Sequence, residues 1–469
     1  MKKIMSILMA SLMLMGVLAS CNETTPEDET TVAVTTTEVT TEATETEVTQ
    51  TEETETDMSE PDIERTEAEQ LLYEEKMASL RFFLEAVNLD KDSPGYGLVR
   101  DRYPGNPDMA SIASTGFGLA ALPIAVEEGL ISSEDAERQA AGTLRTALTM
   151  EEQEGFLFHF VNMETAKQLP NVEYSTIDTA LLIAGGFVAG EYWGGEVKEL
   201  ADELFRQVNW DYFVDQERMQ FHMSAKPFQG FESYWDYYAE QLIMYVLGAG
   251  SPTHPIDRLV YYRFRREMDS YGSSEPFIHS WHGSIFTYQY SHAFVDFRGI
   301  EDELGARWYE NSVQASIAAY DFAKDIGKEF ETYREGAWGL TASDTAEGYV
   351  GPQGSRPSGN NNAEHVYNGT IATSGALGSY PFTPEYSLEA MELYASIPEL
   401  QGEFGLNNAY NRDIDWYGPD TIGIDKGITA LMIDNKENGL IWELFMRNEH
   451  VQRGLEVLGF TEYEFEAGE

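Results

Sequence analysis

The chain has 469 residues, of which 42% are hydrophobic and 12% aromatic, and its formal net charge is −51. So acidic a composition argues against nucleic acid and other polyanions as partners, because phosphate binding needs a basic surface. A neutral ligand such as a glycan or a peptide stays compatible with the charge. The one cysteine, Cys21, leaves no disulfide or thiolate metal site for the rest of the chain.

The first 21 residues have the pattern of a secretion signal. A basic start, Met1-Lys2-Lys3, is followed by an apolar run from Ile4 to about Val17, which is too short to span a membrane. The next residues, Leu-Ala-Ser-Cys, resemble the bacterial lipobox, in which the chain is cut before the cysteine and lipid is attached to it. The alternative is a stray thiol in a signal region. We therefore expect residues 1–21 to be a lipoprotein signal peptide and Cys21 to anchor an exported protein to the membrane.

Residues 22–61 consist mostly of threonine, glutamate and valine, with no lysine, arginine or glycine. Such a segment buries too little apolar surface to offset the entropy of ordering, and its charges repel one another. It is expected to be a disordered tether, with β-strands as the less favoured reading. No second linker of this kind follows, so residues 62–469 are predicted to form one domain.

Helical patterns dominate that domain and alternate in character. Segments 111–127 and 178–190 are apolar on nearly every side, whereas segments 132–150 and 196–208 are amphipathic. Inner helices of an α/α toroid are buried all round and outer ones face water, so this order predicts a double ring of helices. A plain helical solenoid would give the same alternation, but no fixed repeat period is present and the loops are long and aromatic.

Two segments look like short strands rather than helices: 156–161, FLFHFV, and 284–290, SIFTYQY. We expect them to add short β-hairpins. The predicted fold class is therefore all-α, a single toroid with long loops and a few short hairpins.

The loops combine aromatic residues with isolated carboxylates and few basic groups, which is typical of carbohydrate sites. Cleavage of a glycosidic bond needs two carboxyl groups, one protonated to release the leaving oxygen and one ionised to activate water or attack carbon. Asp425 is a further isolated carboxylate, since it stands between glycines in IGIDKG. The candidate site residues are Asp101, Arg102, Glu173, Asp178, Trp235, Tyr238, Glu240, His292, Asp296, Arg298, Trp338 and Asp344.

Several candidates also have a structural explanation. Asp178 follows Ser175 by three residues, as in a capping box, and Asp101 with Arg102 could form an ion pair that holds a loop. Glu240 opens an apolar helix, where an unpaired buried carboxylate would cost several kcal/mol. Glu173 precedes a predicted helix, where no cap or core requires it. A buried polar network would equally explain the group of His292, Asp296 and Arg298.

Motifs for metal or nucleotide chemistry are missing from the sequence. His279 and His282 are spaced loosely for a metal, but no HExxH or other ligand set accompanies them. There is also no GxSxG, no P-loop, and no GxGxxG that follows a clear strand. No cofactor and no metal are expected.

A set of longer motifs resembles the bacterial glucoamylase-like family, which includes the endo-β-1,2-glucanases. The similarity runs in order over about residues 70–460. The motifs that carry it include GLVRDRYPG, GFLFHFVNMETA, EYSTIDTALLIAGG, TYQYSHAFVDFRG, WGLTASD and IGIDKGITALMIDNKENGLIWELFM. The resemblance implies an (α/α)6 barrel, endo-acting cleavage of β-1,2-glucan with inversion, and no required metal.

The family's site residues carry over onto matching positions. The acid of its Asp-Arg motif falls on Asp101, the glutamate before its S-T-I-D-T helix on Glu173, and the glutamate of its Trp- and Tyr-rich stretch on Glu240. The resemblance thus implies a catalytic set of Asp101, Glu173 and Glu240, without deciding which is the acid. It also aligns the family's histidine, aspartate and arginine with His292, Asp296 and Arg298.

The chain departs from the family pattern in loops expected to border the site. Phe294 stands where the family tends to have tryptophan, and Thr373, Ser374 and Gly375 replace a different family sequence; segment 346–366 is also individual. The exact glycosidic linkage is therefore left open, as is a non-catalytic, lipid-anchored glycan-binding protein. The expected partners are a neutral glucan and, through the lipid, a membrane, with the protein a monomer.

Overall fold

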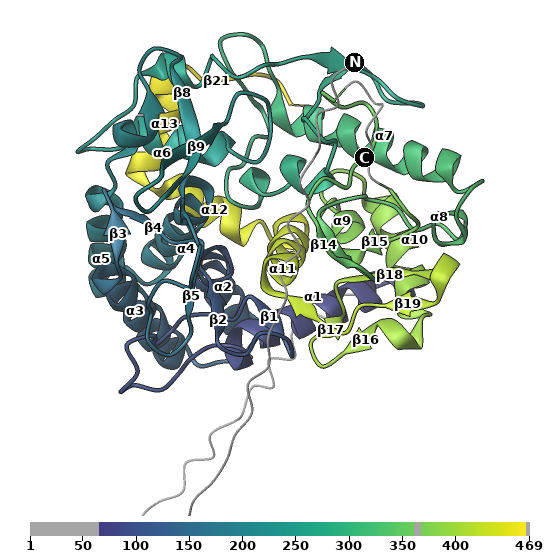
Figure 1. Ribbon diagram of the computed structural model, residues 1–469, viewed down its shortest axis with the longest axis horizontal. Helices are drawn as coiled ribbons and strands as arrows, with labels where there is room; N and C mark the ends of the chain where they lie inside the picture. Colours follow the sequence, from purple (N-terminus) through teal and green to yellow (C-terminus); the bar gives the residue numbers. More distant parts are fainter. Residues whose placement is uncertain (1–64, 361–366, 466–469) are drawn as a thin grey trace, which may run out of the picture. The chain divides into compact units, whose positions relative to one another are not determined.

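The computed structural model describes residues 65–360 and 367–465 (Figure 1). These residues belong to one compact unit, Ile63–Glu469. The expected signal peptide with Cys21 and the expected tether at 22–61 lie outside the described residues. Within the described ranges, no helix is both long and apolar enough for a membrane span.

Helices form most of the regular structure. Two of the 3₁₀ helices matter for the site, η3 (Ile285–Tyr288) and η4 (Ser291–Ala293). The α-helices of the described residues are α1 (Glu67–Glu85), α2 (Ile112–Glu127), α3 (Ser133–Thr149), α4 (Thr176–Trp193), α5 (Gly195–Gln207), α6 (Leu242–Gly250), α7 (Trp308–Ile326), α8 (Glu331–Arg334), α9 (Thr373–Leu377), α10 (Pro384–Ala395), α11 (Gly423–Glu437), α12 (Leu440–Arg447) and α13 (Glu449–Leu458).

The predicted alternation of buried and amphipathic helices is confirmed. Helices α2 and α4 are buried along almost their whole length, whereas α3 and α5 bury one stripe and expose the other. In α3 the buried stripe includes Ala136, Ala140, Leu144 and Ala147, which recur at helical spacing. Figure 1 shows α3 and α5 at the outer left edge, beyond α2 and α4.

Glycines let the two buried helices cross at close range. A Cβ on Gly185 of α4 would lie only 1.9 Å from the carbonyl oxygen of Gly116 in α2, and a Cβ on Gly116 would lie 2.4 Å from the carbonyl oxygen of Leu181. No side chain fits at either position. The Ala- and Gly-rich composition of these helices is therefore a packing requirement.

The inner elements close into a ring. Helix α2 packs against α4, α4 against α6, α9 against α11, and α11 against α2. The gap between α6 and α9 is filled by η3 and η4: Ser291 bonds to α6 through the backbone N–H of Ile243, and Gln289 donates to the carbonyl of Gly375 in α9. Helices α3, α5, α13, α1 and α10 pack outside this ring. Two layers of helices around a centre are the arrangement of an α/α toroid.

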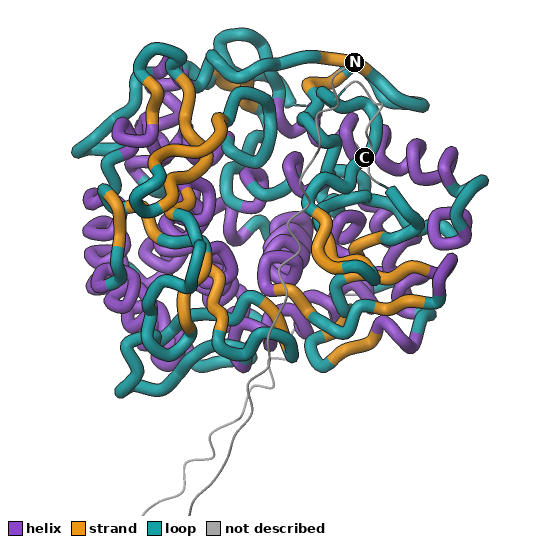
Figure 2. The backbone as a smooth tube through the Cα atoms, viewed as in Figure 1, coloured by secondary structure: helices purple, strands orange, loops and turns teal. Residues whose placement is uncertain are grey.

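Strands are shorter and more numerous than the sequence predicted. They pair antiparallel in nine small sheets, distributed among the loops (Figure 2). The strands of the described residues are β1 (Arg102–Tyr103), β2 (Met109–Ser111), β3 (Glu152–Gln153), β4 (Phe156–Leu157), β5 (Phe160–Asn162), β6 (Tyr174–Ser175), β7 (Val214–Asp215), β8 (Gln220–Lys226), β9 (Gly230–Tyr234), β10 (Met268–Asp269), β11 (Phe277–Ile278), β12 (Ile300–Glu301), β13 (Ser343–Thr345), β14 (Gly348–Val350), β15 (Ile371–Ala372), β16 (Gln401–Gly402), β17 (Gly405–Leu406), β18 (Ala409–Asn411), β19 (Trp416–Tyr417), β20 (Thr421–Ile422) and β21 (Thr461–Glu462).

One of the two strand predictions is wrong. Segment 156–161 does contain strand residues, split between β4 and β5, but segment 284–290 forms η3 and no strand. Its aromatic residues alternate as in a strand. A 3₁₀ turn, however, places Ile285 and Tyr288 together on the core side, where both are buried, and leaves Phe286 on the wall of a cavity.

A short strand stands directly before four of the inner helices. β2 leads into α2, β6 into α4, β15 into α9 and β20 into α11. The register pairs Arg102 with Ile422 and Tyr174 with Ala225, so loops distant in sequence are tied together at this end of the ring. The N-terminal ends of the inner helices are thereby held around one space.

Candidate active site

A cavity of about 570 Å³ lies at the N-terminal ends of the inner helices. Residues in or just before the first turns of α2, α4, α6, α9 and α11 line it. The helix dipoles therefore direct their positive ends at this space, which favours negative charge there. Its wall carries five carboxylates, Asp101, Glu173, Asp178, Glu240 and Asp425, and four aromatic rings, Phe160, Phe286, Tyr290 and Tyr349.

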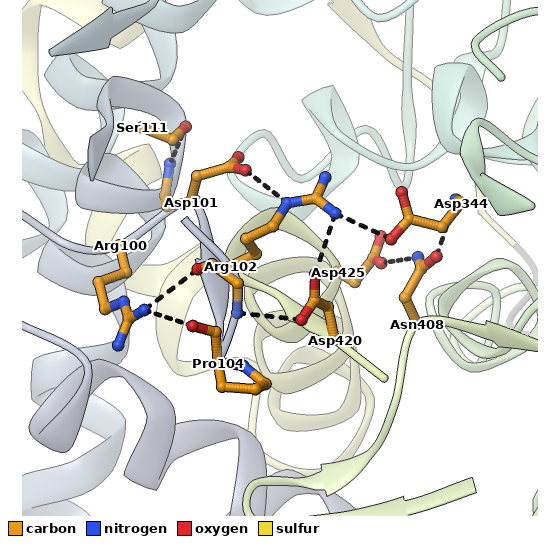
Figure 3. A network of polar contacts seen from close by, with 11 residues as sticks. Arg100, Asp101, Arg102, Pro104, Ser111, Asp344, Asn408, Asp420 and Asp425 are labelled. Atoms are coloured by element: carbon orange, nitrogen blue, oxygen red, sulfur yellow. Dashed lines mark hydrogen bonds and ion pairs between the residues drawn. The ribbon is translucent and has the colours of Figure 1, made fainter. Parts of the chain in front are cut away.

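Arg102 connects three acidic residues at one side of the cavity (Figure 3). Its Nε donates to Asp101 at 3.1 Å, and its Nη1 donates to Asp344 at 2.9 Å and to Asp420 at 3.3 Å. Burial raises the pKa of Asp101, although the Arg102 charge opposes the rise. The ion pair suggested by the sequence is present, and it ties the loop that carries Asp101 to two further loops. Asp344 reaches the site through Arg102.

Glu173 and Asp178 both face His159. A backbone bridge between Phe158 and Tyr174 sets the register, so that Nδ1 of His159 lies 3.0 Å from Glu173 and Nε2 lies 3.5 Å from Asp178. The hydrogen bond from His159 lowers the pKa of Glu173 despite partial burial. Burial alone would lower the pKa of His159, but the charges of Asp178 and Glu173 raise it above its ordinary value. Glu173 is therefore ionised at neutral pH.

Asp178 has contacts at the helix start and a position on the cavity wall. The side chain of Ser175 caps α4 by accepting from the backbone N–H of Asp178 at 3.3 Å, and its hydroxyl donates to the Asp178 carboxylate. The same carboxylate lines the cavity and faces His159. A helix cap and a site residue thus coincide.

Glu240 precedes α6 and lines the cavity. Its backbone carbonyl accepts from the hydroxyl of Ser291 at 2.5 Å, which fixes the start of α6 to η4. Burial raises the pKa of the Glu240 carboxyl to about 7, and the charge of Asp178 adds to the rise. Much of this group is therefore protonated at neutral pH, as a proton donor requires.

Asp425 lies in the first turn of α11, on the far side of the ring from α6. Its carboxylate accepts from the amide of Asn408 at 2.5 Å (Figure 3). It also accepts from the hydroxyl of Ser374 at 3.0 Å. Burial raises the pKa of Asp425 to about 6, against these two hydrogen bonds. In the ring order α2, α4, α6, η3 with η4, α9, α11, the helices of Glu240 and Asp425 are three places apart. The two groups therefore approach the cavity from opposite sides.

The predicted aromatic residues Trp235 and Tyr238 line a neighbouring cavity of about 470 Å³. Both are nearly fully buried: the indole N–H of Trp235 donates to Thr176 at 3.0 Å, and Tyr238 stacks on Trp308 with ring centroids 5.0 Å apart. They form part of the wall of that cavity, where Trp235 contacts α4 and Tyr238 contacts α7.

Four predicted binding residues lie away from both cavities. His292 is buried against Ser312 at 2.9 Å, and burial lowers its pKa to about 3, so it is a neutral core residue. Arg298 pairs with Asp296 at 2.8 Å. Trp338 is buried and donates to a backbone carbonyl of α10. The geometry therefore gives no support to the binding roles predicted for these four residues. His292 belongs to a buried polar network, as the alternative explanation has it. Asp296 and Arg298 pair with each other, and Trp338 is part of the core.

Other residues of the site were missed as candidates. The sequence predicts only a strand around His159, and marks Ser374 only as a departure from the family pattern. Asn408 and Gln289 are buried amides whose contacts depend on loops far apart in sequence. Asp425 stands outside the predicted set of candidates. The signal that marks it is its isolation between glycines in IGIDKG.

Among the described residues, no group of three or more His, Cys, Asp or Glu side chains is arranged to hold a metal ion. The chemistry available in this cavity is that of carboxylates, one histidine and one arginine. A helical double ring with paired carboxylates and aromatic rings in a central cavity is typical of glycoside hydrolases.

Comparisons with known proteins agree with this class. A family model described as "putative glucoamylase" matches residues 232–449. A curated exo-β-1,2-glucooligosaccharide sophorohydrolase of Parabacteroides distasonis is 25% identical over 430 residues, which are 83% of this chain and 57% of that protein. The chain thus spans little more than half the length of that relative.

Solved structures show the same relationship. An endo-β-1,2-glucanase of Chitinophaga pinensis, in complex with sophorotriose and glucose, is 26% identical with a TM-score of 0.75, over 85% of this chain and 99% of that one. A Bacteroides uniformis protein described as a glucoamylase is 28% identical with a TM-score of 0.76, over 85% and 99%. The chain is thus similar to the glucoamylase family model over residues 232–449 and to an endo-β-1,2-glucanase structure over most of its length.

Proposed function

We propose that this protein is a glycoside hydrolase that cleaves β-1,2-glucan to short oligosaccharides. The observation that carries the proposal is the placement of Glu240 and Asp425 on opposite sides of one cavity, with the pKa of Glu240 raised to about 7. The family relationship supports the reaction class and the linkage.

Glu240 is the general acid in this mechanism. Its protonated carboxyl donates to the glycosidic oxygen, which leaves as the hydroxyl at C2 of the departing glucose unit. Burial keeps the proton on Glu240 until that oxygen accepts it. The sugar whose C1 is attacked lies between Glu240 and Asp425.

Asp425 is the general base. Asn408 and Ser374 hold its carboxylate in place, and a pKa of about 6 leaves it mostly ionised at neutral pH. It takes a proton from the water that attacks C1 on the face opposite the leaving oxygen. Attack from that face inverts the anomeric carbon, so the reaction is inverting.

The remaining polar groups hold the substrate. The ionised Glu173, oriented by His159, and the Asp178 carboxylate accept from sugar hydroxyls. Arg102 keeps Asp101 at the cavity wall as a further acceptor. The resemblance implies a catalytic set of Asp101, Glu173 and Glu240; we keep Glu240 in that set and assign Asp101 and Glu173 to positioning.

The finer architecture follows from the same ring. Five inner helices, with η3 and η4 in the place of a sixth, support an (α/α)6 barrel. We further propose that the enzyme cleaves in an endo mode, that its domain comprises residues 62–469, and that it is a monomer. We also propose that the protein is exported and anchored by lipid at Cys21, which the signal-like residues 1–21 support.

A substrate whose leaving group needs no proton separates the two catalytic roles. Glu240→Gln should lower hydrolysis of linear β-1,2-glucan by at least about a thousandfold, yet retain activity on β-sophorosyl fluoride, since fluoride leaves unaided. Asp425→Asn should lose activity on both substrates. Glu203→Gln, on the exposed face of α5, is the matched control and should resemble the wild type.

Equal losses on glucan and fluoride for Glu240→Gln would contradict its role as the acid. Binding of β-1,2-glucan without any product from the wild type would instead favour the non-catalytic binding protein.

A further inference from the structure

A second cavity of about 470 Å³ adjoins the first. The two share Glu240 and Phe286 on their walls, so the proposed acid borders both cavities. The second cavity contains none of the other four carboxylates of the first. Its walls come from the hairpin of β8 and β9, the segment before α6, and the loop that leads into η3.

The second cavity is rich in aromatic rings, one of which is exposed. Trp281 has 41% of its surface accessible, whereas Tyr237 beside it is buried. The two rings meet edge to face, with centroids 5.4 Å apart. A half-exposed indole at a cavity wall offers a flat apolar face to a ligand.

The backbone holds Trp281 firmly in this position. A Cβ on Gly359 would lie 2.7 Å from the indole, so this glycine lets the chain pack directly against the ring. The carbonyls of Ser280 and Trp281 accept from the backbone N–H groups of Gly359 and Asn360, at 3.0 and 3.2 Å. The ring is thus fixed before any ligand arrives, which limits the entropy lost on binding.

Polar groups border the same ring. The guanidinium of Arg265 lies 5.9 Å from the centre of Trp281 and 5.3 Å from that of Tyr237. It pairs with Asp236 at 3.1 Å, and both side chains are about half exposed. Donors and acceptors next to a fixed aromatic face suit a neutral, hydroxyl-bearing ligand better than a lipid or an anion.

We infer that the second cavity binds the glucose units on the leaving side of the bond, with Trp281 as their stacking platform. This inference rests on the proposed function. The sugar that is attacked occupies the first cavity, between Glu240 and Asp425. The departing chain begins at the oxygen that Glu240 protonates, and the second cavity has Glu240 on its own wall.

The test compares substrates with and without sugar on the leaving side. Trp281→Ala should lower kcat/KM on β-1,2-gluco-oligosaccharides by about tenfold, the effect of losing one aromatic contact. It should leave hydrolysis of β-sophorosyl fluoride unchanged, because fluoride occupies no sugar position. Trp281→Phe should recover most of the loss. Phe228→Ala removes a fully exposed ring at the tip of the same hairpin wall and should have no effect on either substrate.

Parallel losses on both substrates, or no loss on the oligosaccharides, would overturn the inference. A wild-type protein that binds β-1,2-gluco-oligosaccharides but releases no product would refute the proposed hydrolysis alone.

Discussion

At the scale of single residues, the two buried carboxyls set the pH dependence. Glu240 must be protonated, so kcat/KM should fall as pH rises through its pKa of about 7. Asp425 must be ionised, so kcat/KM should fall as pH drops through its pKa of about 6. A narrow bell-shaped profile on β-1,2-glucan is expected. With β-sophorosyl fluoride the alkaline limb should vanish, and its persistence would show that another group causes it.

Glu173 is expected to act through charge and placement. Glu173→Gln removes the anion that pairs with His159 and should lower glucan hydrolysis by about a hundredfold or more, while thermal unfolding stays unchanged. Glu164→Gln, an exposed neighbour in the same loop, should be silent in both measurements. A fully active Glu173→Gln variant would remove this residue from the site.

From the sequence, a site residue can be recognised when a charged side chain stands in a segment that is otherwise mostly uncharged, and rarely in other cases. Glu240 could be suspected because it stands before an apolar helix, and Asp425 because it is isolated between glycines. His292 could not be assigned, because a polar residue satisfied by Ser312 in the core looks the same in sequence as one that faces a ligand. His159 could not be assigned to the site either, because only the backbone bridge between Phe158 and Tyr174 places it opposite Glu173.

At the scale of elements, the crossing of α2 and α4 holds two walls of the cavity together. Gly185→Ala should destabilise the protein by about 3 kcal/mol or more, since the added methyl group would overlap the carbonyl of Gly116. Gly186→Ala is its matched control: the nearest atom is a flexible Leu144 methyl at 3.2 Å, and the gain in helix propensity of about 1 kcal/mol offsets that contact. Chemical unfolding of both variants decides this, and equal stabilities would contradict the packing argument.

The buried helices were predictable because they are apolar on nearly every side, and the amphipathic ones because their apolar residues recur at helical spacing. The run 284–290 was not, because alternating aromatic residues fit both a strand and a 3₁₀ turn that faces core on one side and cavity on the other. The many two-residue strands also have no sequence signal of their own. They form where the ring brings distant loops together, as in the pairing of β1 with β20.

At the scale of the whole molecule, the toroid was predictable from the order of its helices, but the position of the cavity was not. That position depends on which helix ends converge, and so on the closure of the ring through η3 and η4. The strongly acidic composition and the charge-balanced pair of Arg265 and Asp236 beside Trp281 both suit an uncharged glucan.

Product analysis on linear β-1,2-glucan, beside β-1,3- and α-1,4-glucans, tests the proposed reaction most directly when proton NMR follows the anomeric signal of the first product. We expect short β-1,2-oligosaccharides that appear first as the α-anomer, with no product from the other two glucans and none from Glu240→Gln. Cleavage of only the β-1,3- or α-1,4-glucan, release of the β-anomer, or an undiminished rate in Glu240→Gln would contradict the function and mechanism proposed for this cavity.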